Sequence, residues 1–507
     1  MGTVRSQTTV GTAVLAAVSA LTLAACSTTA PMVQGGDAPA AGGQGAGELS
    51  EYYEQAVDWR DCGSLECASV TVPIDYATPD GDTLDLALNR LVPAGGADRS
   101  VLVNPGGPGG SGLELVESAR GYFGTDLLGG AAIVGFDPRG VGESSGIHCY
   151  SDARLDEWYT TEYDLETDDG WDAMVAAQED YGQACLENNP ELLGHVDTVS
   201  AARDLDIIRA VLGHESLDYL GFSYGTFLGA TYAELFPDRV GRFVLDGAID
   251  PALTYAEMTI GQAAGFETAY RAYLADCLEG GQCPFNGDVD RAYQRTIDLL
   301  EELADSPADT GDPKRPATDA DLISAIVVAL YSTQSWPLLS QAIGGLLDSG
   351  DGATIKWLSD FSLERDEDGH YPEDQGAFTA INCLDFPVTS DREEIETAAE
   401  AAVDASALFG PYLGYGELSC TTWPIEATGT RAPIAAAGTP PIVVIGTTRD
   451  PATPYAWAEA LAEELESGVF LGYDGDGHTA YGNGSCIDPL VEDFLLHGTV
   501  PADGTVC

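Results

Sequence analysis

Short apolar segments alternate with helical patterns in the first half of the chain. Residues 68–74 and 84–92 alternate apolar and polar side chains, as strands with one buried face do. Residues 100–104, 131–136 and 217–222 are almost continuously apolar, which is typical of parallel strands covered on both faces. Helices are expected over residues 197–213 and 226–236, the second stopping before a proline.

The pattern changes after residue 251. Helical periodicity dominates, without a convincing buried strand, over residues 292–304, 319–331, 336–347 and 353–361. The buried-strand pattern returns at 441–446 and 468–472. We therefore predict an α/β fold, a mostly parallel central sheet with helices on both faces and an inserted helical cap. The expected divisions are core 50–250, cap 251–390 and core 391–507.

The first residues predict export. Arg5 precedes an apolar run over 10–25, too short for a comfortable membrane span. The run ends Leu-Ala-Ala-Cys at 23–26, which looks like a bacterial lipobox. We expect a signal peptide over 1–25, a lipid on Cys26 and a flexible linker to residue 49, so that the membrane is reached only through this anchor. An ordinary secretory signal cut nearby is the alternative.

Charge and cysteine content agree with an exported protein. The net charge of −61 disfavours nucleic acid and anionic membranes as partners, although solubility or life in salt explains it equally well. Of 11 cysteines, those other than Cys26 are even in number, and export permits disulfides. Closeness in sequence suggests the pairs Cys62–Cys67, Cys277–Cys283 and Cys486–Cys507, with Cys149–Cys185 and Cys383–Cys420 as the remainder. Their spacing does not favour a zinc site.

A candidate nucleophile lies where the 217–222 strand meets the following helix. Residues 221–225 read Gly-Phe-Ser-Tyr-Gly, which fits G-x-S-x-G with Ser223 at its centre. A strand running straight into a helix needs a tight turn, and glycines on either side let the backbones pass. The alternative is a glycine-lined helix start that only packs against a neighbour.

A serine nucleophile needs a base and an orienting carboxylate. Of six histidines, His478 alone lies in a glycine-containing loop just after a late buried strand. Asp450 follows the 441–446 strand, and the order Ser223, Asp450, His478 is that of α/β hydrolases. Asp474 and Asp476 are the weaker candidates for the acid.

The developing oxyanion needs preorganised donors. One is the backbone N–H of Tyr224, directly after the nucleophile. Residues 104–112 (Asn-Pro-Gly-Gly-Pro-Gly-Gly-Ser-Gly) form a structured loop that can offer bare backbone N–H groups, and Gly107 is the expected second donor. Neither a metal nor an organic cofactor is needed for this chemistry.

Residues 105–109 resemble the H-G-G-P-G loop of proline iminopeptidases, with Pro105 in the histidine position. Together with Asp-Pro-Arg-Gly at 137–140, the serine motif, residues 449–454 and Gly-His at 477–478, the chain is similar to the actinobacterial tripeptidyl aminopeptidase family of exported α/β hydrolases. The resemblance implies a serine exopeptidase acting on peptides with free N-termini. It also implies a TAP-like C-terminal segment from about residue 407.

In proline iminopeptidases, carboxylates of the cap bind the amino group of the substrate. By its place at the cap exit, Asp385 is the first candidate for this role and Asp246 the second, with a structural hydrogen-bonding role as the alternative for both. The rival functions are a carboxylesterase or lipase with the same triad, and a non-catalytic cell-surface binding protein. The number of residues released and any preference for proline stay open.

Overall fold

The computed structural model describes residues 49–507 except 282 and 485. The expected signal peptide, Cys26 and most of the linker lie outside the described residues. Among the helices that are described, none is long and apolar enough to cross a membrane.

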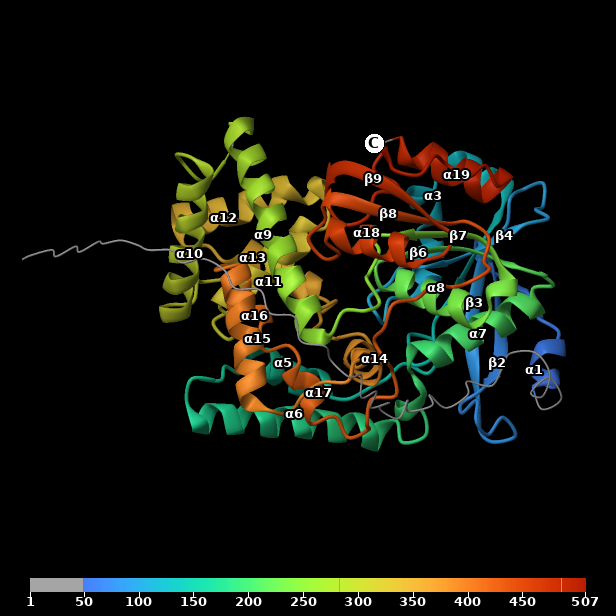
Figure 1. Cartoon of the computed structure of the whole chain (residues 1–507). Helices are drawn as coiled ribbons and strands as arrows, with labels where there is room; N and C mark the ends of the chain where they lie inside the picture. The colour runs from blue at the N-terminus through green and yellow to red at the C-terminus, as the bar shows by residue number, and fades with distance from the viewer. Residues whose placement is uncertain (1–48, 282, 485) are drawn as a thin grey trace, which may run out of the picture. The chain divides into compact units, whose positions relative to one another are not determined.

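One ten-stranded sheet forms the centre of the fold, in the order β1-β2-β3-β5-β4-β6-β7-β8-β9-β10 (Figure 1). From β5 to β10 all neighbouring strands are parallel, whereas β1, β2, β3 and β5 pair antiparallel. The strands are β1 (Arg60–Cys62), β2 (Leu65–Pro73), β3 (Thr83–Leu91), β4 (Ser100–Asn104), β5 (Ala132–Phe136), β6 (Leu217–Phe222), β7 (Val240–Asp246), β8 (Ile442–Arg449), β9 (Gly468–Asp476) and β10 (Thr505–Val506).

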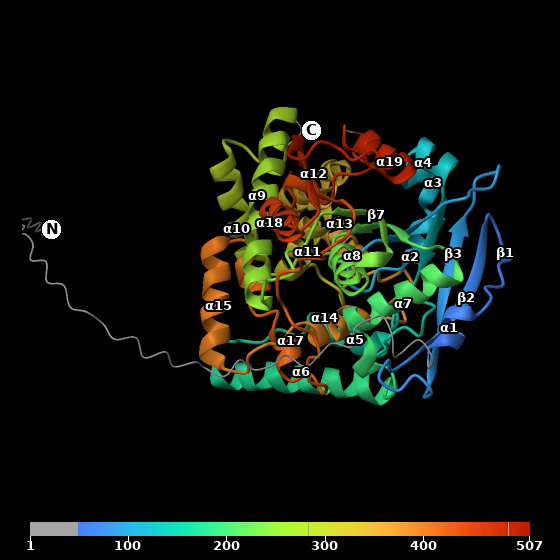
Figure 2. The same ribbon diagram turned by 45° about the vertical axis from the view of Figure 1, so that its right-hand side comes forward.

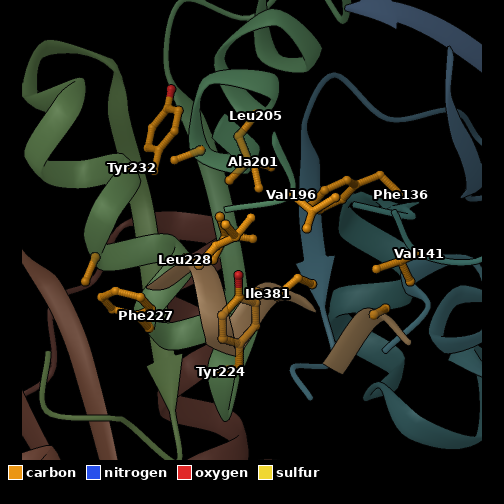
Figure 3. Packing of buried hydrophobic residues seen from close by; sticks show 14 of the residues in the cluster. Phe136, Val141, Val196, Ala201, Leu205, Tyr224, Phe227, Leu228, Tyr232 and Ile381 are labelled. Carbon is orange, nitrogen blue, oxygen red and sulfur yellow. The ribbon is translucent and has the colours of Figure 1, made fainter. Parts of the chain in front are cut away.

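Helices cover both faces of this sheet, because successive side chains of a strand point to opposite sides. On β6, Tyr219 belongs to one apolar core and Leu220 to another. The first core includes α7 and α8 (Figure 3), and the second includes α2, α3, α4 and α19. These helices and their neighbours are α1 (Ser50–Glu54), α2 (Gly112–Glu117), α3 (Ala119–Tyr122), α4 (Thr125–Gly130), α5 (Asp152–Thr160), α6 (Asp168–Asn188), α7 (Thr198–Val211), α8 (Tyr224–Leu235), α18 (Tyr455–Glu464) and α19 (Ile487–His497).

Between β7 and β8 the chain is helical, as predicted for the insert (Figure 2). Helices α9 to α13 enclose an apolar core of their own. The helices are α9 (Tyr255–Gly280), α10 (Val289–Asp305), α11 (Asp319–Leu330), α12 (Trp336–Ser349), α13 (Ala353–Ser362), α14 (Ala377–Asp385), α15 (Arg392–Ala405), α16 (Gly410–Leu413) and α17 (Leu418–Thr421). Helix α15 lies beyond the expected boundary at residue 390 and packs against α9 and α16, while its Ile395 joins an apolar cluster with Trp171 of α6 and Leu418 of α17.

In the described part of the chain, five disulfides join the cysteine pairs that were expected, three from closeness in sequence and two as the remainder. Three close short or terminal loops: Cys62–Cys67, Cys277–Cys283 and Cys486–Cys507. Cys149–Cys185 ties the segment before α5 to α6, and Cys383–Cys420 ties α14 to α17. The last two bridge 36 and 37 residues of sequence, the first before β6 and the second within the helical insert.

Candidate active site

Ser223 occupies the turn between β6 and α8 in a strained conformation. Its φ of 55° and ψ of −124° are rare for a residue with a side chain. Ser223 is partly exposed, although both neighbours are buried. The turn is tight because a Cβ added to Gly221 would lie 2.4 Å from the carbonyl oxygen of Gly225. This is the geometry of a nucleophile elbow, which lifts the hydroxyl above the sheet edge.

The glycine-rich loop lies directly against this turn. A Cβ added to Gly106 would lie 2.5 Å from the carbonyl oxygen of Phe222 and 2.8 Å from the Cβ of Ser223. It would also lie 3.0 Å from the backbone nitrogen of Tyr224. Only a glycine backbone fits so close to the serine, and Gly107, the expected oxyanion donor, is the next residue. Asn104 holds the loop, because its side-chain oxygen accepts the N–H of Gly106 at 3.0 Å.

His478 and Asp450 form a close, buried pair. The Nδ1 of His478 lies 2.9 Å from Oδ1 and 3.0 Å from Oδ2 of Asp450. The histidine side chain is 9% exposed and the aspartate side chain 0%. Asp450 follows β8 and His478 follows β9, and these strands are parallel neighbours. Because the carboxyl ends of parallel strands share one edge of the sheet, residues 28 apart in sequence meet there.

Backbone donors hold the Asp450 carboxylate in place. Its Oδ1 accepts the N–H groups of Ala452 at 3.0 Å and Thr453 at 2.9 Å, and its Oδ2 accepts that of Thr479 at 3.0 Å. The hydroxyl of Thr453 lies 3.4 Å from Nδ1 of His478. The three N–H groups hold the carboxylate in place, and its contact with Nδ1 fixes the side of the imidazole that carries the proton.

The two weaker candidates for the acid are engaged elsewhere. Asp474 lies 3.0 Å from a guanidinium nitrogen of Arg449, and Asp476 binds the same guanidinium at 2.6 and 3.2 Å. Both carboxylates therefore neutralise an arginine on β8. Of the three aspartates, Asp450 is the one placed against His478.

The serine turn and the histidine loop meet across the end of β7. The N–H of Ser223 donates to the carbonyl oxygen of Asp246 at 2.9 Å. A Cβ added at Gly247, the next residue, would lie 3.3 Å from Cε1 of His478. The loops after β6, β8 and β9 thus gather around one point at the edge of the sheet.

The environment of His478 favours its protonated form. Burial lowers the pKa of the imidazole, but the charge of Asp450 and the hydrogen bond to it outweigh that effect. Asp246 adds a smaller contribution, and the net direction is a pKa above the usual 6.5. A base that becomes cationic during a reaction is stabilised in this way.

A residue of the helical insert closes over His478. The backbone carbonyl of Tyr331, at the end of α11, accepts the N–H of His478 at 3.0 Å. The two rings also meet edge to face, with centroids 5.0 Å apart. Tyr331 was not among the candidate residues, because nothing in a helix end of the insert marks it for contact with a loop 147 residues later. The contact places the insert beside the Asp450–His478 pair.

The two expected amine-binding carboxylates are both turned into the protein. Asp246 is fully buried and accepts the N–H groups of Ala480 at 3.0 Å and Tyr481 at 2.8 Å. Asp385 is 4% exposed and accepts the N–H and hydroxyl of Thr198 at 2.9 and 2.5 Å. Both carboxylates are buried and hydrogen-bonded within the protein, which agrees with the structural alternative for each residue.

Two carboxylates that were not among the candidates, Glu114 and Glu364, lie near the glycine-rich loop. Glu114 lies on α2, which follows this loop, and Glu364 follows α13 of the insert. The pKa of Glu114 is raised first by burial and then by repulsion from Asp137 and Asp374. That of Glu364 is raised by burial and by Glu114 and Asp374. Within the described part of the chain, no group of three or more His, Cys, Asp or Glu side chains is arranged to hold a metal ion.

Comparison with known proteins identifies the family. A family model described as TAP-like protein matches residues 405–507. Serine protease Hip1 of Mycobacterium tuberculosis is 37% identical over 89% of this chain and 91% of its own. Carboxylesterase B of the same organism is 36% identical, over 90% and 88%. Tripeptidyl aminopeptidase of Streptomyces coelicolor is 30% identical, over 89% and 86%.

These similarities run over nearly the whole described fold. They agree with the mostly parallel sheet, the helical insert and the serine turn, and they confirm both the predicted α/β-hydrolase fold and the family resemblance. They also support a hydrolase of the serine type. The chain belongs to the TAP-like family of α/β hydrolases, and it is a serine hydrolase.

Proposed function

We propose that this protein is an exported serine exopeptidase that removes short N-terminal units, such as tripeptides, from peptides. The observation that carries the proposal is the buried Asp450–His478 pair at the same sheet edge as the strained Ser223 turn. The names of two relatives, a serine protease and a tripeptidyl aminopeptidase, favour peptides as substrates.

In the proposed mechanism, Ser223 Oγ attacks the scissile carbonyl while its proton passes to Nε2 of His478. Asp450 accepts the Nδ1–H and stabilises the imidazolium. The N–H groups of Tyr224 and Gly107 bind the oxyanion. His478 then gives the proton to the leaving amine, the C–N bond breaks, and an acyl-enzyme remains. Water, activated by the same imidazole, releases the peptide acid and restores Ser223.

Binding of a substrate amine is supported by charge. Burial and then repulsion from Glu114 raise the pKa of Glu364, so a positive charge bound beside these carboxylates would relieve that repulsion. The helical insert beside His478 favours chain ends over the middle of long chains, because it covers one side of the reacting groups. No cofactor enters any step.

A carboxylesterase is the second candidate, because carboxylesterase B is as similar to this chain as the protease. An esterase uses the same serine, histidine and aspartate but has no need for a free substrate amine. Acetylated and free substrates should then react equally well. An aminopeptidase should lose nearly all of its rate when the amine is blocked.

The test uses a fluorophosphonate probe and a pair of tripeptide anilides, one free and one N-acetylated. We expect Ser223→Ala to abolish both labelling and hydrolysis, whereas Ser349→Ala, on the far end of α12, leaves both unchanged. The free peptide should react at least about a hundredfold faster, since a lost charged contact costs about 3 kcal/mol. Labelling that survives Ser223→Ala would refute the nucleophile, and equal rates would favour the esterase.

Export and anchoring are proposed from the lipobox and the disulfides. The five disulfides suit an oxidising compartment. If Cys26 carries lipid, metabolic labelling with a fatty acid should mark the wild-type protein and be lost in Cys26→Ala. Label retained in that variant would contradict the anchor but not the export.

A further inference from the structure

A buried chain of hydrogen bonds runs behind the serine turn. The hydroxyl of Tyr224 contacts the hydroxyl of Thr198, and that hydroxyl lies 2.5 Å from Oδ2 of Asp385. The N–H of Thr198 also donates to Oδ1 of Asp385, at 2.9 Å. The three side chains come from α8, α7 and α14, and all three residues are at most 6% exposed. Tyr224 projects into the apolar core beside Phe227 and Leu228 (Figure 3).

The Asp385 carboxylate sets the direction in which these hydrogen bonds are donated. Above its pKa of about 7, Asp385 is charged and can only accept. The Thr198 hydroxyl then donates to Asp385 and accepts from the Tyr224 hydroxyl. Every buried donor of the chain is thereby satisfied. An amide at position 385 would offer an N–H to Thr198 in place of the acceptor, so one hydroxyl proton, that of Thr198 or of Tyr224, would be left without an acceptor. Such a buried, unpaired donor is costly.

Arg431 compensates part of the buried charge. Its guanidinium lies 4.2 Å from the ring centroids of both Phe227 and Phe386. It donates to the carbonyl oxygens of Leu253 at 3.0 Å and Asp250 at 3.2 Å. Burial raises the pKa of Asp385 to about 7, Thr198 and Arg431 lower it, and Asp197 at the start of α7 raises it. The protein thus keeps a costly carboxylate where an apolar side chain could pack.

The position of this chain suggests what it does. Tyr224 directly follows Ser223, whose positive φ persists only if the surrounding structure fixes it from both sides. On one side, the N–H of Ser223 donates to Asp246. On the other side, the residue after Ser223 is Tyr224, whose side chain is held by the hydrogen bond to Thr198. The backbone N–H of Tyr224 is the expected oxyanion donor. An error of 1 Å in such a donor can cost about a hundredfold in rate.

We propose that Asp385 is a positioning residue, which through Thr198 and Tyr224 holds the oxyanion N–H at the serine turn. The inference rests on the proposed function. It connects the oxyanion site of that function to the end of α14 in the insert. Asp385 ends α14, and the disulfide Cys383–Cys420 ties that helix to α17. A displacement of α14 in the insert would therefore also displace the oxyanion N–H of Tyr224.

The test compares Asp385→Asn, Thr198→Val and Tyr224→Phe with a matched pair in the insert. There, the hydroxyls of Tyr270 and Thr296 also meet in a buried contact, at 2.6 Å. We expect the three variants to lower kcat about 10- to 100-fold, less than the full loss of an oxyanion donor, with KM changed less than about twofold. Tyr270→Phe should keep the wild-type kcat, although its melting temperature should fall about as much as that of Tyr224→Phe.

A transition-state analogue separates positioning from packing. Affinity for a peptide boronic acid should fall by the same factor as kcat/KM, while affinity for the product peptide stays unchanged, because only the analogue carries the tetrahedral oxyanion. The double variant Asp385→Asn with Thr198→Val should be no slower than the worse single variant, because both break one chain. Asp385→Asn with Tyr270→Phe should show only the Asp385 effect on kcat.

Unchanged kcat in folded Asp385→Asn and Tyr224→Phe would overturn the inference and leave Asp385 a purely structural residue. So would equal losses in affinity for the analogue and the product. If Asp385→Asn does not fold, Tyr224→Phe, which removes one hydroxyl, decides alone. Failure of the proposed function is distinct, because it would show as activity that survives Ser223→Ala or as equal wild-type rates on the free and N-acetylated peptides.

Discussion

The backbone carbonyl of Tyr331 accepts the N–H of His478 at 3.0 Å, so the end of α11 in the insert touches the proposed base. The tyrosine ring meets the imidazole edge to face at 5.0 Å. The loop of the base is thus held from two sides, by Asp450 in the sheet domain and by Tyr331 in the insert.

Replacement of the Tyr331 ring tests this second support. An edge-to-face pair contributes about 0.5–1.5 kcal/mol, so Tyr331→Ala should lower kcat by about two- to tenfold. The backbone hydrogen bond remains in this variant. Tyr412→Ala, at a comparably exposed tyrosine of α16, should leave steady-state kinetics unchanged. Identical kcat values in the two variants would show that the ring does not orient the imidazole.

Asp450→Asn should have a much larger effect. The amide would donate where Nδ1–H now donates, so the imidazole would settle in the wrong tautomer, and we expect kcat to fall about 10⁴-fold. Substrate affinity should hardly change, because Asp450 is fully buried. The matched variant is Asp476→Asn, whose carboxylate pairs with Arg449. A larger loss in Asp476→Asn than in Asp450→Asn would reassign the acid.

Gly106→Ala tests the close approach of the glycine-rich loop to the serine. The added Cβ would collide with the Phe222 carbonyl and the Ser223 Cβ, at 2.5 and 2.8 Å. We expect at least about a hundredfold loss of kcat/KM, comparable to removal of an oxyanion donor. Gly96→Ala shares the positive φ (76°) but meets nothing within 4 Å. It should cost about 1 kcal/mol of stability and no activity.

The rate should depend on the ionisation of His478. The base must be neutral to accept the serine proton, and its pKa lies above 6.5 because Asp450 outweighs burial. The rate should therefore fall as pH drops through a value above 6.5, seen in kcat/KM against pH. Protonation of Asp246, whose pKa is about 6, removes one contribution that raises the pKa of His478, so it should broaden the acid limb rather than steepen it. A limb that begins well below pH 6.5 would contradict this electrostatic balance.

Stability should have the opposite trend with pH. Burial raises the pKa of Asp246 to about 6 and that of Asp385 to about 7, against about 3.9 in an unfolded chain. Both groups then favour the folded state most fully below pH 4, and this stabilisation is lost as pH rises through 6 and 7. Urea unfolding should show a lower midpoint at pH 8 than at pH 5. Asp385→Asn should flatten the dependence, and an unchanged slope would argue against a raised pKa at this residue.

The sequence predicted strands and helices well where the local hydrophobic pattern determines the secondary structure. The strands β4 and β6 match the expected ranges because parallel strands covered on both faces are continuously apolar. Helix α6 was not predicted, since its buried side chains are few and its exposed face is acidic. The boundary of the insert was also hard to place, because the helices before and after residue 390 have the same amphipathic pattern.

For the site, the sequence by itself determined which residues are proposed to carry the chemistry and in what order they occur. Ser223, Asp450 and His478 each follow a strand, and parallel strands end at one edge, so local signals suffice to nominate them. The tertiary structure alone decided the partners of Asp246 and Asp385. Asp385 meets Thr198 across 187 residues of sequence, and a carboxylate at a helix end looks the same whether it will face substrate or core. Burial and long-range hydrogen bonds are properties of the folded chain, and no local pattern encodes them.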